Sequence, residues 1–216
     1  MGDENPEEAW SGDFGENYVE RHMESVEQLN EKWENKKFGI SWTELLERFF
    51  KDIDKDAKIL EVGCNYGTKL KSLQQIGYKN LYGIDIQPKA IEQAHKNRPE
   101  LNVIKGNALD IPFKDGFFDV VYTNGVLIHI PPDEINDAMD EITRCTSKWV
   151  YGHEYYSDTV TEVKYRGRDR LLWKADFPSM YQEGRDLEVA DIEYLDHIDN
   201  ENTDVEFLLR KTSDES

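Results

Sequence analysis

The stretch that decides the fold runs from Lys58 to Thr68 and reads Lys-Ile-Leu-Glu-Val-Gly-Cys-Asn-Tyr-Gly-Thr. Its first part, Lys58 to Val62, predicts a short buried strand, and the apolar spacing from Thr68 to Ile76 predicts a helix. Between them, Gly63 and Gly67 form a turn whose missing side chains let a ligand lie against the backbone and the free helix amides. The stretch therefore predicts a ligand site between a strand and a helix.

The same pattern continues along the chain. Strands are predicted at Leu81–Ile86, Leu101–Lys105 and Phe118–Asn124 and from Trp149 onward, and helices begin near Pro88 and Pro132. Strict alternation of strands and helices implies parallel strands joined by right-handed crossovers.

The last part of the chain departs from this alternation. Leu187–His197 and Val205–Leu209 are separated only by a polar turn, which predicts an antiparallel hairpin at the sheet edge. The fold class is therefore α/β, a doubly wound, mostly parallel seven-stranded sheet with an antiparallel C-terminal hairpin strand.

Length and composition predict one folded unit with an appendage. The chain has 216 residues, 38% of them hydrophobic and 12% aromatic, which is too apolar for a disordered protein. Residues 1–34 hold 11 acids and two bases among scattered aromatics. We expect an N-terminal helical arm at residues 1–40, either a solvated segment or a lid over a ligand, and a domain at residues 41–216.

Charge and composition also limit the partners. Forty-five acids against 26 bases give a net charge of −19, which disfavours a nucleic-acid partner. No apolar run is long enough to cross a membrane. Cys64 and Cys145 suggest neither a disulfide framework nor a metal site, so we expect a cytoplasmic protein without metal. The oligomeric state is not indicated.

Three further segments point to a cofactor at the predicted turn. Asp85 ends the second strand, where an acid can accept both ribose hydroxyls of an adenosine-containing ligand. Asn107 and Ala108 follow the third strand and could flank an adenine. Asn65 stands where dinucleotide-binding turns normally carry their middle glycine, so a cofactor without a phosphate is favoured. Each feature alone also has a structural explanation, and their coincidence favours the cofactor.

The segment from Glu61 to His129 resembles the class I S-adenosylmethionine-dependent methyltransferases, which share a Rossmann-like fold. The resemblance implies an S-adenosyl-L-methionine cofactor. The cofactor-binding residues that it implies are Tyr18, Glu61, Gly63, Asn65, Gly67, Asp85, Ile86, Asn107, Ala108, Thr123, Asn124 and Gly125.

A narrower resemblance covers most of the chain. Trp10 to Arg21, Gly125 to Ile130, Glu154 to Tyr156, and the segments around Tyr165 and Lys174 are similar to methylases associated with pseudaminic acid biosynthesis. This resemblance implies a small sugar or nucleotide-sugar acceptor.

The acceptor site is predicted beyond the ends of the fourth and fifth strands. Lys164–Lys174 carries five bases against one acid, a local charge of +4 that could hold an anionic small-molecule acceptor or simply pair with the protein's surplus acids. The expected acceptor-binding residues are His129, Tyr156, Arg166, Arg168 and Lys174.

Methyl transfer depends mainly on alignment and exclusion of water. A hydroxyl acceptor would benefit from a general base, for which Glu154 and His153, with Tyr155 beside them, are the catalytic candidates. His129 is equally a candidate to orient a loop. The expected function is methyl transfer to oxygen or nitrogen. The alternatives are a non-catalytic cofactor-binding regulator and a nicotinamide oxidoreductase, the latter disfavoured by Asn65.

Overall fold

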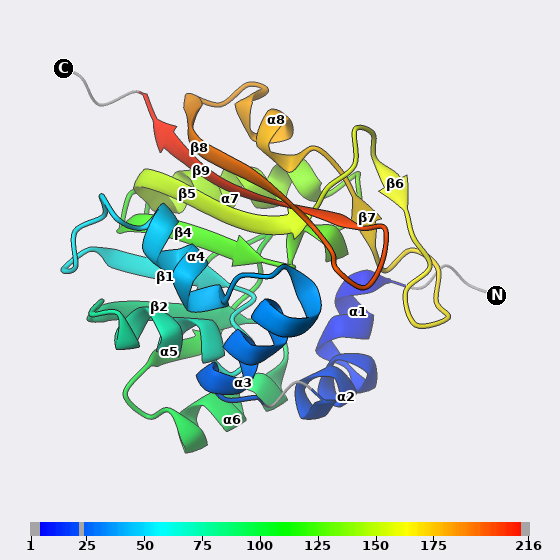
Figure 1. Cartoon of the computed structure of the whole chain (residues 1–216), viewed down its shortest axis with the longest axis horizontal. Coiled ribbons are helices and arrows are strands. Elements are labelled where there is room, and N and C mark those ends of the chain that lie inside the picture. The colour runs from blue at the N-terminus through cyan, green and yellow to red at the C-terminus, as the bar shows by residue number, and fades with distance from the viewer. Residues whose placement is uncertain (1–4, 22–23, 213–216) are drawn as a thin grey trace.

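The computed structural model describes residues 5–21 and 24–212 and contains one seven-stranded sheet in the order β3-β2-β1-β4-β5-β9-β8 (Figure 1). The first five strands in this order are parallel, and β9 and β8 are antiparallel. The predicted α/β fold class is thus confirmed. The sheet strands are β1 (Lys58–Val62), β2 (Asn80–Asp85), β3 (Asn102–Lys105), β4 (Phe118–Asn124), β5 (Thr146–Tyr155), β8 (Leu187–Asp196) and β9 (Thr203–Lys211).

Helices cover both faces of the sheet. In Figure 1, α4 crosses in front of the strands and α7 lies behind them. The helices of the described residues are α1 (Pro6–Ser11), α2 (Asp13–Arg21), α3 (Val26–Lys32), η1 (Trp33–Lys37), α4 (Trp42–Phe49), α5 (Thr68–Gln75), α6 (Pro88–Asn97), η2 (Leu127–His129), α7 (Ile135–Cys145) and α8 (Phe177–Gln182).

Two apolar clusters, one on each face, hold these layers together. On one face α4 buries its whole apolar side against the sheet, with Trp42, Leu45 and Leu46 fully buried. On the other face Met139 and Ile142 of α7 are equally buried. Each such side chain stabilises the fold by roughly 1.5–3 kcal/mol. The packing fixes the ends of the parallel strands, where the loops of a ligand site must lie.

Some local features differ from the sequence-based expectations. The fifth strand begins at Thr146, three residues earlier than expected, since α7 passes directly into it. A small two-stranded sheet, β6 (Thr161–Glu162) with β7 (Trp173–Lys174), and the helix α8 have no counterpart in the prediction, whereas η1 lies within the helical arm expected at residues 1–40. All of these lie in segments that lack regular apolar spacing.

The expected boundary at residue 40 does not coincide with a break in packing. Leu29 of α3 and Trp33 of η1 belong to the same core cluster as α4. By contrast, α1 and α2 contact mainly each other and α6. The N-terminal segment thus has two parts, and its residues 1–4 and 22–23 lie outside the described residues.

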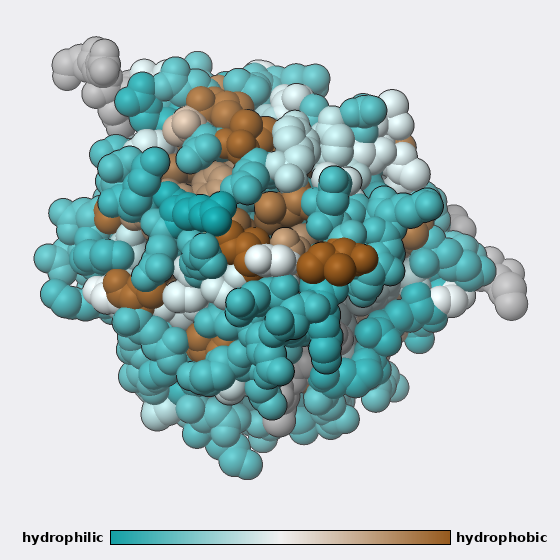
Figure 2. All heavy atoms as spheres, viewed as in Figure 1, coloured by the Kyte–Doolittle hydropathy of each residue, from teal (hydrophilic) through white to brown (hydrophobic). Residues whose placement is uncertain are grey.

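The surface is mainly hydrophilic, and the apolar patches on the face shown in Figure 2 are small compared with the polar area around them. Exposed apolar side chains include Tyr194 of the edge strand β8 and Ile198, which follows it. Within the part of the chain that the structure describes, none of the helices has both the length and the apolar character needed to span a bilayer.

Candidate cofactor and acceptor site

A pocket opens at the carboxyl ends of β1, β2, β3 and β4. In this fold the strand order reverses between β1 and β4, which is where open α/β sheets bind ligands. The pocket encloses about 1050 Å³ of empty space, part of it open to solvent. Its walls come from the loops after these four strands and from α1 and α2 of the N-terminal arm.

The loop between β1 and α5 forms one wall of the pocket. Gly63 has φ +70°, and a Cβ there would lie 2.4 Å from Cγ2 of Val126, so a larger residue would push the next loop away. Asn65 has φ +49°, in the left-handed region that asparagine tolerates better than most residues. The loop therefore has a sharp turn at its tip, and Gly67 begins α5 behind it.

Asp85 connects this loop to the end of β2. One carboxylate oxygen accepts the backbone N–H of Asn65 at 2.7 Å, and the other accepts the N–H of Gln87 at 2.8 Å. Burial raises the pKa of the Asp85 carboxyl, while these backbone donors oppose the rise. The backbone N–H of Ile86 also acts on this carboxyl, and because a carboxylate has about four acceptor positions, part of that capacity remains for a ligand.

Two ionisable residues lie beneath the same loop. Glu61 is 1% exposed, and burial raises its pKa to about 7, opposed by the charge of Lys69. Lys69 lines the pocket and approaches the carbonyl oxygen of Asn124 at 3.4 Å. Desolvation lowers the pKa of Lys69. Glu61 does not line the pocket, so its contribution is electrostatic.

The loop after β3 supplies a further wall. Asn107, Ala108 and Leu109 all line the pocket. The side-chain oxygen of Asn107 accepts the backbone N–H of Leu109 at 3.0 Å. Asn107 thus uses its oxygen to shape its own turn, and its amide N–H groups remain for a ligand.

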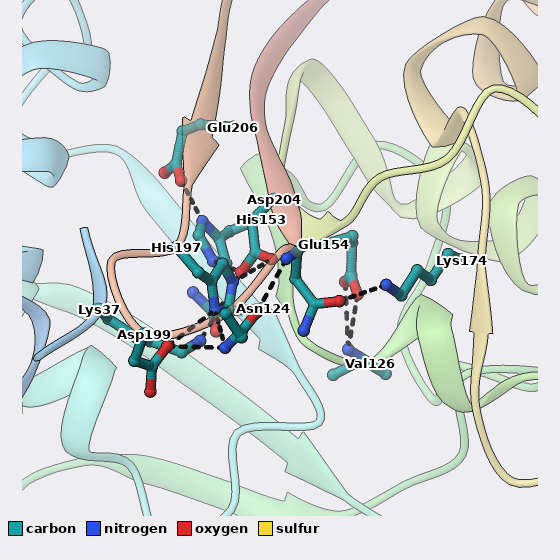
Figure 3. Close-up of polar contacts among 12 residues, drawn as sticks. Lys37, Asn124, Val126, His153, Glu154, Lys174, His197, Asp199, Asp204 and Glu206 are labelled. Atoms are coloured by element: carbon teal, nitrogen blue, oxygen red, sulfur yellow. Dashed lines mark hydrogen bonds and ion pairs between the residues drawn. The ribbon is translucent and has the colours of Figure 1, made fainter. Parts of the chain in front are cut away.

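The loop after β4 is held by Glu154. The buried Glu154 carboxylate accepts the backbone N–H groups of Val126, Leu127 and Ile128 at 3.0–3.4 Å, as Figure 3 shows for Val126. Desolvation raises its pKa to about 7, although these donors oppose the rise. Glu154 is absent from the pocket wall. Its geometry is that of a side chain that positions the loop carrying Gly125.

His153 lies in a buried polar network away from the pocket. Its Nε2 is 2.8 Å from Asp204, and its Nδ1 contacts Glu206 (Figure 3). The other carboxylate oxygen of Asp204 contacts His197 at 2.8 Å. Lys37 Nζ lies 3.7 Å from the oxygen that contacts His153. Burial lowers the pKa of His153 and raises that of Glu206 well above its usual value. His153 is thus not among the residues that line the pocket, because both of its ring nitrogens face β9.

The basic segment also lies outside the pocket wall. The Arg166 guanidinium lies 5.6 Å from the Tyr165 ring centroid, and that of Arg168 lies 4.7 Å from the Phe14 ring centroid. Lys174 donates to the side-chain oxygen of Asn202. Tyr155 and Tyr156 point elsewhere, and Tyr156 donates to Asp158 at 2.6 Å. Arg166 and Arg168 thus lie against the rings of Tyr165 and Phe14, and Lys174 lies against the turn between β8 and β9. Neither these three residues nor Tyr155 and Tyr156 line the pocket.

The N-terminal arm closes the pocket with aromatic rings. The Trp10 ring centroid lies 4.3 Å from that of His129 and 5.2 Å from that of Tyr18. Gln87 fixes this arrangement by donating to the carbonyls of Trp10 and Gly12 at 3.1 and 2.9 Å. All but Gly12 line the pocket.

The structure thus brings together most of the expected cofactor residues. The expected residues that line the pocket are Tyr18, Gly63, Asn65, Asp85, Ile86, Asn107, Ala108, Asn124, Gly125 and His129. Glu61, Gly67 and the buried Thr123 support it from behind. Sequence reasoning missed Trp10, Lys69 and Gln87 as members of this wall. Only their closeness to quoted motifs could have singled out Lys69 and Gln87.

The pocket wall also has unused hydrogen-bonding capacity. Three buried polar atoms on lining residues have no hydrogen-bond partner among the described residues: Trp10 Nε1, Asn65 Oδ1 and Asn124 Nδ2. An unpaired buried polar atom costs about 1–3 kcal/mol. A polar ligand would offset this cost, so the donor set fits a cofactor with both donors and acceptors.

Comparison with known proteins agrees with this geometry. Residues 60–149 match the family model described as "Methyltransferase domain". An uncharacterized methyltransferase of Synechocystis sp. is 32% identical over 92 residues, which are 43% of this chain and 43% of that protein. The chain thus spans less than half of that relative's length.

Solved structures show the same fold. The 1,6-didemethyltoxoflavin-N1-methyltransferase of Burkholderia thailandensis, with its bound acceptor and S-adenosylhomocysteine, superposes with a TM-score of 0.68 at 13% identity, covering 99% of this chain and 93% of that one. Magnesium protoporphyrin IX methyltransferase of Synechocystis, with bound S-adenosylhomocysteine, gives 0.62 at 15% identity, covering 78% and 80%.

The match over residues 60–149 agrees, for that segment, with the expectation of a methyltransferase-type enzyme. The fold shared with two methyltransferases that hold S-adenosylhomocysteine agrees with the expected S-adenosylmethionine cofactor.

Proposed function

We propose that the chain is an S-adenosylmethionine-dependent methyltransferase that transfers a methyl group to a nitrogen or oxygen atom of a small metabolite. One observation carries the proposal: Asp85 holds the tip of the Gly63–Gly67 loop through the N–H of Asn65, and it lines the pocket, where a carboxylate can accept further hydrogen bonds from a ligand. The domain match at residues 60–149 supports the same function.

Specific side chains would hold the cofactor. The remaining acceptor capacity of Asp85 suits the ribose hydroxyls, and Ile86, Asn107 and Ala108 lie where they can flank an adenine. Asn65 Oδ1 and Asn124 Nδ2 offer one acceptor and one donor to the amino-acid end. The bound cofactor supplies an electrophilic methyl group. The chain itself aligns the acceptor and excludes water, which can account for much of the rate enhancement.

The arm formed by α1 and α2 is the second part of the proposal. It contributes Pro6, Trp10 and Tyr18 to the pocket wall, and Gln87 joins it to the domain. A lid at this end of the chain is thus favoured over a solvated segment. Residues 26–40 pack with the core, so the lid comprises the two helices that precede α3.

The finer expectation of an anionic, sugar-type acceptor stays a prediction, as does the likeness to pseudaminic acid-associated methylases. Arg166 stacks on Tyr165, whose ring lies 5.3 Å from the His129 ring. The Tyr165 ring therefore separates the basic segment from the His129 side chain in the pocket wall. A cytoplasmic location also stays a prediction.

The experiment that tests the function starts with Asp85→Ala. Loss of the charge-assisted hydrogen bonds to Asn65 of the loop and to Gln87, and of the ribose contact, should weaken S-adenosylhomocysteine binding at least about tenfold in a calorimetric titration. Asp56→Asn, an exposed acid paired with Lys79, is the matched control and should bind like the wild type.

A second measurement separates catalysis from cofactor binding alone. Methyl-labelled S-adenosylmethionine incubated with the wild type and a metabolite extract should give a labelled product. Tight binding with no labelled product from any extract would instead favour the non-catalytic cofactor-binding alternative.

A further inference from the structure

His129 presents one unused ring nitrogen in the pocket. Its Nδ1 lies 2.6 Å from the carbonyl oxygen of Leu171, and because a carbonyl only accepts, Nδ1 carries the hydrogen. Burial lowers the His129 pKa to about 4, so the ring is neutral near pH 7 and Nε2 has a free lone pair. Among the described residues, no hydrogen bond to Nε2 is formed, and the side chain lines the pocket.

Trp10 places a donor beside this acceptor. The two ring centroids are 4.3 Å apart, and Trp10 Nε1 is buried without a partner in the described part of the chain. The arm therefore supplies a donor, Trp10 Nε1, and the loop after β4 supplies an acceptor, His129 Nε2, on two neighbouring rings. The buried, unpartnered indole N–H is an observation independent of the histidine geometry, and it also indicates a polar ligand.

The rest of this wall shows which charge the ligand can have. Pro6, Ile130 and Pro131 are apolar, and the ionisable lining residues nearest to them along the chain are Glu7 and Glu134. Among the residues that the structure describes, no arginine lines the pocket, and the one lining lysine, Lys69, approaches the carbonyl of Asn124. Two carboxylates beside a neutral imidazole disfavour an anion and suit an amine-type group, in contrast to the anionic acceptor expected from the basic segment.

We infer, building on the proposed function, that the acceptor is a small amine or nitrogen heterocycle whose reacting N–H is bound by His129 Nε2, while Trp10 Nε1 donates to a neighbouring acceptor atom of the same molecule. A neutral nitrogen needs no base before attack, whereas a hydroxyl does. The weakly basic His129 suits the first case and orients the nitrogen lone pair toward the methyl group.

The step balances without another reactant. The nitrogen lone pair forms the new N–CH₃ bond while the S–CH₃ bond breaks, and the pair of the broken bond remains on sulfur as an uncharged thioether. The nitrogen becomes positively charged, and the hydrogen bond to Nε2 stabilises that charge as it develops. The N–H proton is then released to water.

His129→Asn tests this assignment. The asparagine N–H₂ can still donate to the carbonyl of Leu171, so the fold should be kept. The lone pair of Nε2, which would bind the acceptor, is lost. His95→Asn is the matched control, because His95 also contacts a carbonyl, that of Val103 at 2.8 Å, and lies outside the pocket. We expect His129→Asn to bind S-adenosylmethionine within about twofold of the wild type. His129→Asn should lower the rate of labelled-methyl transfer to an extract at least about tenfold, while His95→Asn keeps the full rate.

Two further readouts make the outcome decisive. Mass spectrometry and NMR of the labelled product should show an N-methyl group, and an O-methyl product or full activity of His129→Asn would overturn the inference alone. A crystal structure with S-adenosylmethionine should place Nε2 within about 7 Å of the methyl carbon, the sum of a near-attack distance and one hydrogen bond. A larger distance, or protein atoms between Nε2 and the methyl carbon, also overturns the inference. This readout does not require an extract that contains the acceptor. Absence of cofactor binding would overturn the proposed function itself.

Discussion

At the residue scale, two neighbouring polar residues of β5 have different structural roles. Glu154 binds the backbone of the loop after β4, and His153 joins Asp204 and Glu206 on the opposite face of the strand. Alternation along a strand requires this separation. The sequence identified both residues as chemically unusual, but it could not show which partners would occupy their polar atoms, because those partners lie far away in the chain.

Replacing His153 tests the difference between a structural and a catalytic role. His153→Gln leaves Asp204 or Glu206 without its buried hydrogen-bond partner, so we expect a loss of about 1–3 kcal/mol in the free energy of unfolding. Urea unfolding measures it, and S-adenosylhomocysteine titration of the folded variant should give nearly wild-type affinity. Strongly weakened S-adenosylhomocysteine binding by a variant of wild-type stability would contradict this structural role and indicate that His153 takes part in ligand binding.

At the element scale, α1 and α2 join the domain through a close backbone approach. A Cβ at Gly15 would lie 1.9 Å from the Trp10 carbonyl oxygen and 2.9 Å from the Gln87 amide nitrogen. A side chain here must separate α1 from α2 or displace Gln87. Glycine thus allows one pair of helices to form a wall of the pocket.

Gly15→Ala should therefore open the lid without unfolding the domain. We expect S-adenosylhomocysteine affinity to fall several-fold, because Trp10 and Tyr18 no longer close the pocket. The thermal midpoint should change by only a few degrees, since α1 and α2 lie outside both core clusters. Glu20→Ala, an exposed change on the same helix, controls for helix effects. Equal binding by the two variants would show that the arm is not a lid.

The elements of the parallel sheet were predictable from sequence for a physical reason. β1 and β4 begin and end where expected, because their buried runs are bounded by turn residues. The β6–β7 sheet and the individual helices of the expected arm were not, because two-residue strands and short helices derive their stability from tertiary contacts. Trp10 and Gln87 were not assigned to the site, because their roles depend on the contact between the arm and the start of α6, whereas Asp85 follows directly from the end of a buried strand.

At the scale of the whole molecule, buried carboxyls couple stability to pH. Glu61 and Glu154 have pKa values raised to about 7 by burial. In the unfolded chain a glutamate ionises near pH 4.5, so the folded state binds more protons between these values. Their contribution to stability is therefore complete below about pH 4.5 and is lost as pH rises through about 7.

Glu154→Gln cannot ionise and should reduce this dependence. We expect the wild type to lose up to roughly 1.4 kcal/mol per pH unit more than the variant as pH rises from 4.5 to 7. Denaturant titrations of both proteins at several pH values measure the difference. Parallel curves for the two proteins would mean that Glu154 ionises normally in the fold.

The arm that closes the pocket also bears on the order of events during synthesis. Trp10 leaves the ribosome before Gln87, His129 and Tyr165, the later residues that it contacts in the folded protein. The central strands pair through nearer neighbours in the chain. A nascent chain should therefore acquire its sheet before its binding site, and a truncated product could be folded in its middle yet unable to retain a ligand.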